Sequence, residues 1–287
     1  MNEFVIYSAI VGHYDEINQP KVVDDRFDYI LFSDTVEKKQ IGVWQVRSIP
    51  YHNEIQTKIA RWVKTHPELL LSEYKASLWL DSNVIISDSF VYDRVVELAE
   101  NHVLVSTTKH SERSCVYGEL FEILCRRIES EKVVLRWGHR LRKEKYPKDH
   151  GLSETGVLFR FHSENKIALF DQMWWNCIEK YSRRDQASFN FVLWKMDIPW
   201  QYFIPDGGSV YYSNCFVCVE HKENGCISRR ITRKKMEAWL IRYYEKCPEK
   251  RQAIEEVYYR LYGSPFPVIG ALLLGQYYRI QYILFRK

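Results

Sequence analysis

The sequence predicts an α/β fold with a mixed, mainly parallel β-sheet that is flanked by helices. Apolar segments of strand length alternate along the chain with segments whose apolar residues recur at helical spacing. The strand-like segments are almost continuously apolar, as expected for strands that are buried on both faces. A hydrophobic content of 46% and a charged content of 27% are typical of a globular protein. The 287 residues can form one large domain or two small ones.

Three strand-like segments fall within the first fifty residues. Residues 4–11 lead into the turn Gly12-His13-Tyr14-Asp15, whose glycine allows the backbone to approach a ligand closely. Residues 29–34 end in Ser-Asp, and residues 44–49 are closed by Pro50. Because the carboxyl ends of parallel strands meet at one edge of a sheet, we expect a polar, ligand-binding edge there.

A fourth strand carries the most informative pattern. The apolar residues 77–80 are followed by Asp81 and Asn83, and an aliphatic run then resumes at residues 84–86. A carboxylate and an amide oxygen two residues apart are hard ligands suited to Mg²⁺ or Mn²⁺. The same Asp-Ser-Asn sequence is also ordinary turn chemistry. A metal-binding motif and a structural turn therefore both remain open at this point.

A helical segment precedes that strand, between residues 53 and 74. Its apolar stripe follows helical spacing and consists of Ile55, Ile59, Trp62 and Val63. Lys58 and Arg61 lie three residues apart beside the stripe, so one helix face presents two cations that suit a diphosphate. Solvated lysine and arginine side chains would give the same pattern. A short helix is expected from Pro67 to Leu71.

The alternation continues through the second half. We expect helices over residues 88–101, 167–181 and 189–194, and strands over residues 103–106, 157–161 and 210–219. Asp88 is the expected N-cap of the first of these helices. Asp185 precedes the last helix, where a carboxylate is favoured by the helix dipole alone. The charge-rich residues 109–149 are expected to form a pair of helices outside the sheet or a mobile segment.

Several classes of protein are disfavoured. The start, Met1-Asn2-Glu3, lacks the basic region of a signal peptide, and no uncharged run reaches membrane-spanning length. Seven cysteines without scaffold spacing suit a reducing compartment, so we expect a cytoplasmic protein. Residues 136–148 and the basic tail would suit a nucleic-acid partner. The 41 basic and 37 acidic residues argue against a continuous basic face, so we expect no nucleic-acid binding.

The composition changes at residue 228, which predicts a main domain over residues 1–227 and a basic, aromatic, helical C-terminal extension over residues 228–287. Helices of this kind can lie on an anionic membrane surface, here the inner face, through residues 229–287. They can equally pack on the sheet or on a second subunit, so an oligomer is the other interpretation.

A set of motifs resembles a known family. In chain order they are Gly12-His13-Tyr14-Asp15, Tyr29-Ile30-Leu31-Phe32-Ser33-Asp34, the helix that ends in Thr65-His66-Pro67-Glu68, Leu78-Trp79-Leu80-Asp81-Ser82-Asn83, and Arg183-Arg184-Asp185-Gln186-Ala187-Ser188-Phe189. Over about residues 3–222 the chain resembles the TOD1/MUCI70 glycosyltransferase-like domain and, more distantly, other GT-A glycosyltransferases. The resemblance implies a Rossmann-like GT-A sheet, a nucleotide-sugar donor, and Mn²⁺ or Mg²⁺ held by a DxD-type motif. Asp81 and Asn83 occupy that motif, and the amide at position 83 weakens metal affinity.

The resemblance also implies roles for individual residues. Donor-binding residues are expected to be Val11, Gly12, Tyr14, Asp34, Lys58, Arg61, Asp81, Ser82 and Arg184. Transfer with inversion needs a general base on the acceptor hydroxyl, and Asp185 is the first candidate, followed by Glu154. The sequence does not decide between inverting and retaining transfer.

His221 is a candidate third metal ligand, because GT-A enzymes often add a late histidine, and an ordinary histidine at the edge of the sheet is the alternative. The spacing Cys215-x2-Cys218-x2-His221-x4-Cys226 also resembles a compact zinc site, although strand geometry would place Cys215 and Cys218 on opposite sides.

The predicted function is therefore transfer of a sugar from a nucleotide-sugar donor to a glycan or lipid-linked acceptor in surface polysaccharide or glycolipid synthesis. The alternative is a non-catalytic nucleotide- or carbohydrate-binding module with a degenerate site. Hydrolysis of UDP-sugars with Mn²⁺ distinguishes the two.

Overall fold

The computed structural model describes residues 2–12, 14–125, 128–148, 150–162 and 165–219, together with 251–252, 255–256 and 265. The chain forms two compact units, one of residues 1–124 with 129–227 and one of residues 125–128 with 228–287. Apart from the few positions just given, the predicted C-terminal extension lies outside the described residues. The first unit contains the elements below.

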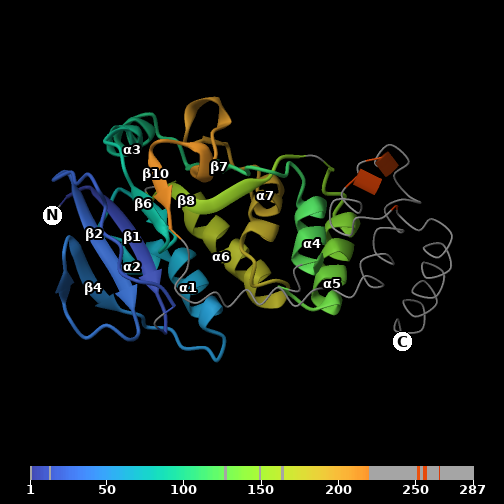
Figure 1. Ribbon diagram of the computed structural model, residues 1–287, viewed down its shortest axis with the longest axis horizontal. Helices are drawn as coiled ribbons and strands as arrows, with labels where there is room; N and C mark the ends of the chain where they lie inside the picture. Colours follow the sequence, from blue (N-terminus) through green and yellow to red (C-terminus); the bar gives the residue numbers. More distant parts are fainter. Residues whose placement is uncertain are drawn as a thin grey trace. The chain divides into compact units, whose positions relative to one another are not determined.

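The first unit is built on one large and one small β-sheet (Figure 1). Its strands are β1 (Phe4–Ile10), β2 (Phe27–Ser33), β3 (Gln40–Ile41), β4 (Trp44–Ser48), β5 (Ala76–Leu80), β6 (Val84–Ile86), β7 (Val105–Lys109), β8 (Ser153–Phe161), β9 (Trp200–Tyr202) and β10 (Phe216–Cys218). The eight-stranded sheet has the order β3-β4-β2-β1-β5-β8-β7-β9, and β10 pairs with β6 in a separate ribbon. Strand β1 is central and runs parallel to both of its neighbours.

The sheet is mixed, as predicted. Strand β4 runs parallel to β2, and β9 runs parallel to β7. Strand β8 is antiparallel to both β5 and β7, and the short β3 is antiparallel to β4. The carboxyl ends of β1, β2 and β5 therefore meet at one edge of the sheet, where the sequence placed the polar residues.

Helices flank this sheet (Figure 1). They are α1 (Gln56–Lys64), α2 (Pro67–Leu70), α3 (Phe90–Glu100), α4 (Val116–Cys125), α5 (Glu131–Lys143), α6 (Asn165–Lys180) and α7 (Gln186–Lys195), with the 3-10 turns η1 (Pro205–Gly207) and η2 (Val210–Tyr212). Because side chains alternate along a strand, neighbouring residues face opposite layers. Ile6 packs in one cluster with α3, whereas the hydroxyl of Tyr7 donates to the carbonyl of Lys64 at the end of α1.

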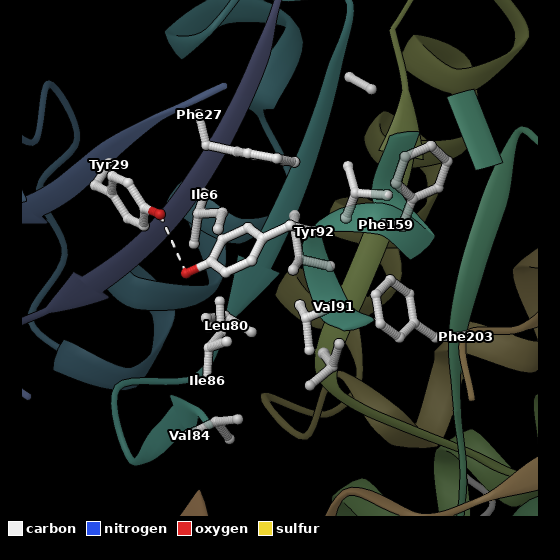
Figure 2. Packing of buried hydrophobic residues seen from close by; sticks show 14 of the residues in the cluster. Ile6, Phe27, Tyr29, Leu80, Val84, Ile86, Val91, Tyr92, Phe159 and Phe203 are labelled. Carbon is white, nitrogen blue, oxygen red and sulfur yellow. Dashed lines mark hydrogen bonds between the residues drawn. The ribbon is translucent and has the colours of Figure 1, made fainter. Parts of the chain in front are cut away.

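The core on the α3 side joins the sheet to the β6 ribbon. Figure 2 shows Val91 and Tyr92 of α3 beside Ile6 and Leu80 of the sheet. The Tyr29 hydroxyl donates to the Tyr92 hydroxyl at 3.1 Å (Figure 2), and the Tyr92 hydroxyl donates to the carbonyl of Val22 at 2.5 Å, so both buried phenols are paired.

Some predicted elements differ from the structure. The run 210–219 is not one strand, because Val210–Tyr212 forms η2 and only Phe216–Cys218 forms a strand. Helix α3 has Ser89 rather than Asp88 as its N-cap, although Asp88 Oδ1 accepts a hydrogen bond from Phe90 N at 2.8 Å. The charge-rich segment 109–149 contributes the end of β7 as well as α4 and α5.

Candidate active site at the sheet edge

Two carboxylates meet one buried ammonium group at the polar edge of the sheet. Asp81 follows β5, and Asp185 is the N-cap residue of α7. The Nζ atom of Lys64 lies 3.2 Å from Asp81 Oδ1 and 2.6 Å from Asp185 Oδ2. The Lys64 side chain is completely buried, so its charge is compensated by these carboxylates rather than by water.

A second cation joins the same pair. Arg61 Nε lies 3.0 Å from Asp185 Oδ1, and Arg61 Nη1 lies 3.6 Å from Asp81 Oδ1. Thr155 Oγ1 on β8 donates to Asp185 Oδ2 at 2.8 Å. Two positive and two negative side chains thus form one compact cluster, which we call the four-charge cluster (Arg61, Lys64, Asp81 and Asp185).

Helix α1 places both cations because of its sequence. Ile59 and Val63 are buried against the sheet, and Arg61 and Lys64 are three residues apart on the neighbouring face. The helix ends at Lys64, shortly before Pro67, because the position before a proline disfavours helical geometry.

Lys58, the other predicted cation, has a different partner. Its Nζ atom donates to the carbonyl oxygen of Glu179 in the last turn of α6, at 3.2 Å. The sequence predicted that Lys58 accompanies Arg61 at the site, whereas in the structure Lys64 lies beside Arg61 in the four-charge cluster. The three-residue spacing of Lys58, Arg61 and Lys64 was the available signal, but spacing alone did not show which pair reaches the sheet edge.

The cluster keeps both carboxylates ionised. Burial opposes the charged form of Asp185, but the charges of Arg61 and Lys64 outweigh it and hold the pKa well below its usual range. The pKa of Asp81 is also lowered, because Lys64 and Arg61 outweigh the effect of burial. Burial dominates for Lys64 and lowers its pKa, against the opposing carboxylates.

Asp81 is the more accessible carboxylate. Its side chain is 28% exposed, whereas that of Asp185 is 4% exposed. Trp79 Nε1 donates to Asp81 Oδ1 at 2.7 Å, and both cations also approach Oδ1. Among the described residues, Oδ2 is therefore the oxygen of Asp81 that is left for a ligand.

The residues after Asp81 form a tight polar turn. Ser82 Oγ donates to Asp15 Oδ2, which ties the β5 turn to the loop after β1. Asn83 Nδ2 donates to the carbonyl of Val219 at 3.3 Å, and Val219 N donates back to the carbonyl of Asn83 at 2.9 Å. The amide of Asn83 is thus engaged with the backbone, as in the structural interpretation of this motif.

The described residues do not by themselves complete a metal site. Within the ranges given above, no group of three or more His, Cys, Asp or Glu side chains is arranged to hold a metal ion. Asp81 offers one carboxylate oxygen beside two cations that already compensate its charge. His221 and Cys226 lie outside the described residues, and Cys215 and Cys218 have free thiols.

The loop after β1 forms the predicted floor. Gly12 has a φ of +63°, and its N–H donates to Asp34 Oδ1 at 2.9 Å, which joins the ends of β1 and β2. Val11 is buried, and its carbonyl accepts from Tyr14 N at 3.4 Å. The Tyr14 hydroxyl lies within electrostatic reach of Arg61, whose pKa is lowered by burial but raised more by Asp185, Asp81 and Tyr14. The structure therefore brings this floor next to the four-charge cluster.

Glu154, the second candidate base, has several partners. Its Oε1 accepts from Ser111 N at 2.8 Å, and its Oε2 accepts from Ser209 Oγ at 2.9 Å and Val210 N at 3.1 Å. The carboxylate therefore joins the loop after β7 to the turn η2.

Arg184 lies next to Asp185 in the chain. Its guanidinium charge contributes to lowering the pKa of Asp185, after burial, Arg61 and Lys64. Arg184 Nε is buried and makes no hydrogen bond with any residue that the structure describes. Arg184 is thus a third cation at this edge, within electrostatic reach of Asp185.

The sequence did not predict a buried network of hydrogen bonds that contacts the end of α1. Arg160 on β8 forms a 2.6 Å ion pair with Asp171 on α6, and both side chains are completely buried. Arg160 Nη2 donates to the carbonyl of Lys64 at 2.6 Å and to the Tyr7 hydroxyl. The network therefore fixes the backbone from which Lys64 reaches the two carboxylates. A single arginine inside the apolar run 157–161 was the signal in the sequence, because a buried arginine needs a partner.

Comparison with known proteins identifies the family. A family profile described as "TOD1/MUCI70, glycosyltransferase-like domain" matches residues 1–221. The chain belongs to the TOD1/MUCI70 glycosyltransferase-like family. That range contains every described residue of the four-charge cluster and of the floor, and membership supports a general role in glycosyl transfer.

The structure of a second protein is similar to this TOD1/MUCI70 domain. It is described as the apo structure of WbbM, a bifunctional glycosyltransferase, with a TM-score of 0.42 and 12% sequence identity. The match covers 71% of this chain and 38% of WbbM, so the chain spans well under half of that protein. No curated protein matches the sequence. None of the helices in the described part of the chain is long and apolar enough to span a bilayer.

Proposed function

We propose that this TOD1/MUCI70 domain transfers a sugar from a nucleotide-sugar donor to a hydroxyl group of a glycan or glycolipid. The observation that carries the proposal is the four-charge cluster at the carboxyl edge of the sheet. Arg61 and Lys64 are held within 3.6 Å of Asp81 and Asp185, which is an arrangement that can exchange a carboxylate partner for a phosphate.

The cations would stabilise the leaving group. Breaking the bond between sugar and nucleotide leaves a diphosphate, whose added negative charge needs positive groups in fixed positions. Arg61, Lys64 and the neighbouring Arg184 supply such groups. The base of the nucleotide would lie on the floor formed by Gly12, Tyr14 and Asp34.

Asp185 would act as general base only after the donor binds. In the structure its two oxygens contact Arg61, Lys64 and Thr155, and its lowered pKa makes it a weak proton acceptor. A bound diphosphate shares the charge of Arg61 and Lys64, which weakens their hold on Asp185 and raises its pKa. Donor binding and base activation are thereby linked in this proposal.

Metal assistance stays a prediction. A Mn²⁺ or Mg²⁺ ion bound at Asp81 would add positive charge beside the diphosphate. Asp81 provides the one charged oxygen, because position 83 is a neutral amide whose Nδ2 donates to the carbonyl of Val219. Donor binding with little dependence on Mn²⁺ is therefore the expected result.

We also propose the biological setting of this activity. The acceptor would be a surface polysaccharide or a glycolipid, the location would be cytoplasmic, and residues 229–287 would contact a membrane or a second subunit.

A non-catalytic nucleotide- or carbohydrate-binding module is the second candidate function. It is favoured because both oxygens of Asp185 are paired and position 83 is an amide.

Thermal unfolding tests the proposal. The full chain is unfolded with UDP, GDP, CDP and their sugars, each with and without Mn²⁺. A ligand at about 100 times its Kd stabilises the folded state by about 2.7 kcal/mol.

One of the three nucleotides and its sugars should raise the Tm, and Arg61→Met should abolish this shift. Arg26→Met is the matched control, because Arg26 lies at the opposite end of β2 in an exposed ion pair with Asp24. If no nucleotide shifts the Tm, or if Arg61→Met keeps the shift, the donor site is wrong.

A further inference from the structure

Two adjacent tyrosines are exposed on η2. Tyr211 is 62% exposed and Tyr212 is 78% exposed, the largest fraction among the exposed large apolar side chains of the described residues. Single exposed apolar side chains are common, whereas contiguous exposed apolar side chains are typical of binding surfaces. Tyrosine suits such a surface because the ring is apolar and the hydroxyl forms hydrogen bonds.

The turn that carries these rings is held in place. Val210 is buried, and its N–H donates to Glu154 Oε2 at 3.1 Å. Ser209 Oγ donates to the same oxygen at 2.9 Å and accepts from Tyr211 N at 3.2 Å. The two exposed rings are therefore carried by a backbone that these hydrogen bonds fix in place.

The strands around this turn lead to the four-charge cluster. Thr155, the residue after Glu154, donates to Asp185 at 2.8 Å. Although the side chain is mostly exposed, partial burial raises the pKa of Tyr211, Cys218, Glu154 and Asp81 raise it further, and Arg184 lowers it. The hydroxyl is thus within electrostatic reach of Asp81 and Arg184. The segment that carries η2 continues into β10, drawn in orange in Figure 1. Strand β10 pairs with β6, the strand that follows Asp81.

A tyrosine therefore lies at two approaches to the cluster. Tyr14, in the loop after β1, lies within electrostatic reach of Arg61. Tyr211, in the loop before β10, lies within electrostatic reach of Asp81 and Arg184. The proposed donor occupies the first approach, together with Gly12 and Asp34, so the second approach is where an acceptor would enter.

We propose that Tyr211 and Tyr212 form the acceptor platform, on which a sugar ring of a glycan stacks. The proposal rests on the proposed function and assigns its acceptor side. A pyranose ring has an apolar C–H face that packs on an aromatic ring, while its hydroxyls accept and donate hydrogen bonds at the rim. Two aromatic rings on a three-residue turn offer enough area to stack one or two sugar rings. A stable protein partner would need about 800 Å² on each side.

Binding of the full chain to an array of immobilised oligosaccharides tests the platform, followed by titration of the free oligosaccharides that bind. Tyr211→Ala, Tyr212→Ala and the double variant are compared with Leu169→Ala, another exposed apolar residue, which lies on α6. We expect the double variant to lose at least about tenfold in oligosaccharide affinity, on the scale of 1.4 kcal/mol for each factor of ten. The control should bind as the parent does.

The nucleotide series of the preceding section separates the two proposals. If a nucleotide sugar raises the Tm and the double variant binds glycans like the parent, the platform is wrong and the donor site stands. If no nucleotide binds but glycan binding depends on the tyrosines, the platform stands on a binding module. No oligosaccharide binding by the parent, with or without nucleotide, would overturn the platform. Self-association that the double variant abolishes would assign the rings to a second copy of the chain.

Discussion

Lys64 and Asp185 are 121 residues apart in the sequence, and their charged groups are 2.6 Å apart in the fold. The same ammonium group reaches Asp81 at 3.2 Å, so one buried cation joins α1, the end of β5 and the start of α7. Because the lysine is completely buried, these partners are structurally required as well as chemically useful. The site and the packing of three elements are therefore coupled.

Lys64→Met should lower the free energy of unfolding by about 3–5 kcal/mol, because it leaves Asp81 and Asp185 short of a cation in a buried position. Urea unfolding followed by circular dichroism measures the change. Lys58→Met is the matched control, on the same helix, and should cost less than about 1 kcal/mol because that lysine bonds only the carbonyl of Glu179 among its described partners. Equal effects of the two changes would contradict the buried role of Lys64.

Asp185→Asn should spare donor binding and lower the transfer rate by about 10²–10⁴, the usual contribution of a general base. Donor binding is followed by the Tm shift, and transfer by release of the nucleotide in the presence of an acceptor. Asp81→Asn should instead weaken donor binding. If Asp185→Asn transfers sugar at the parental rate, Asp185 is not the base.

Acid should destabilise the protein through the same carboxylates. The folded-state pKa values of Asp81 and Asp185 lie below those of the unfolded chain. Their contribution to stability is therefore present above about pH 4 and is lost as the pH falls below it. Urea midpoints between pH 6 and pH 3 should fall steeply for the parent and less steeply for Asp185→Asn. Parallel curves would contradict the lowered pKa of Asp185.

Asp171 should have the opposite pH dependence. Burial raises its pKa to about 7, against the charge of Arg160. A raised folded-state pKa gives a contribution that is present below about pH 4 and is lost as the pH rises to 7. Relative to Asp171→Asn, the parent should therefore lose stability between pH 5 and pH 8 in urea unfolding. A stability difference that is constant over this range would show that Asp171 does not titrate there.

Gly12→Ala should destabilise the protein by about 1–2 kcal/mol, because φ at this position is +63°. The new Cβ would also overlap the Gln56 side chain, but this flexible side chain can move away. Gly118→Ala is the matched control, since it lies in α4 with no atom within 4 Å of an added Cβ, and should stabilise by about 0.5–1 kcal/mol. Thermal unfolding of both variants gives the sign, and a stabilising Gly12→Ala would contradict the strained turn.

Local patterns predicted most of the sheet. Continuous apolar runs identified β1, β2 and β5, because strands buried on both faces are apolar at nearly every position. The weaker β4 was identified although only Trp44 of its residues is buried. The short β3 and β9 were missed, because two or three residues carry no periodicity. The run 210–219 was taken for one strand, although Glu154 holds Ser209 and Val210 in a turn through contacts 55 and 56 residues away in sequence.

The sequence by itself determined the family, the mixed α/β fold, and the placement of Gly12, Asp34 and Asp81 at the carboxyl ends of strands. These features depend on neighbouring residues, so their signals are local. Only the tertiary structure decided that Lys64 joins Arg61 at the site, that Glu154 anchors η2, and that Arg160 fixes the end of α1. Helical spacing gives the face on which a side chain lies, but a buried charge takes its partner from whichever distant segment packs against that face.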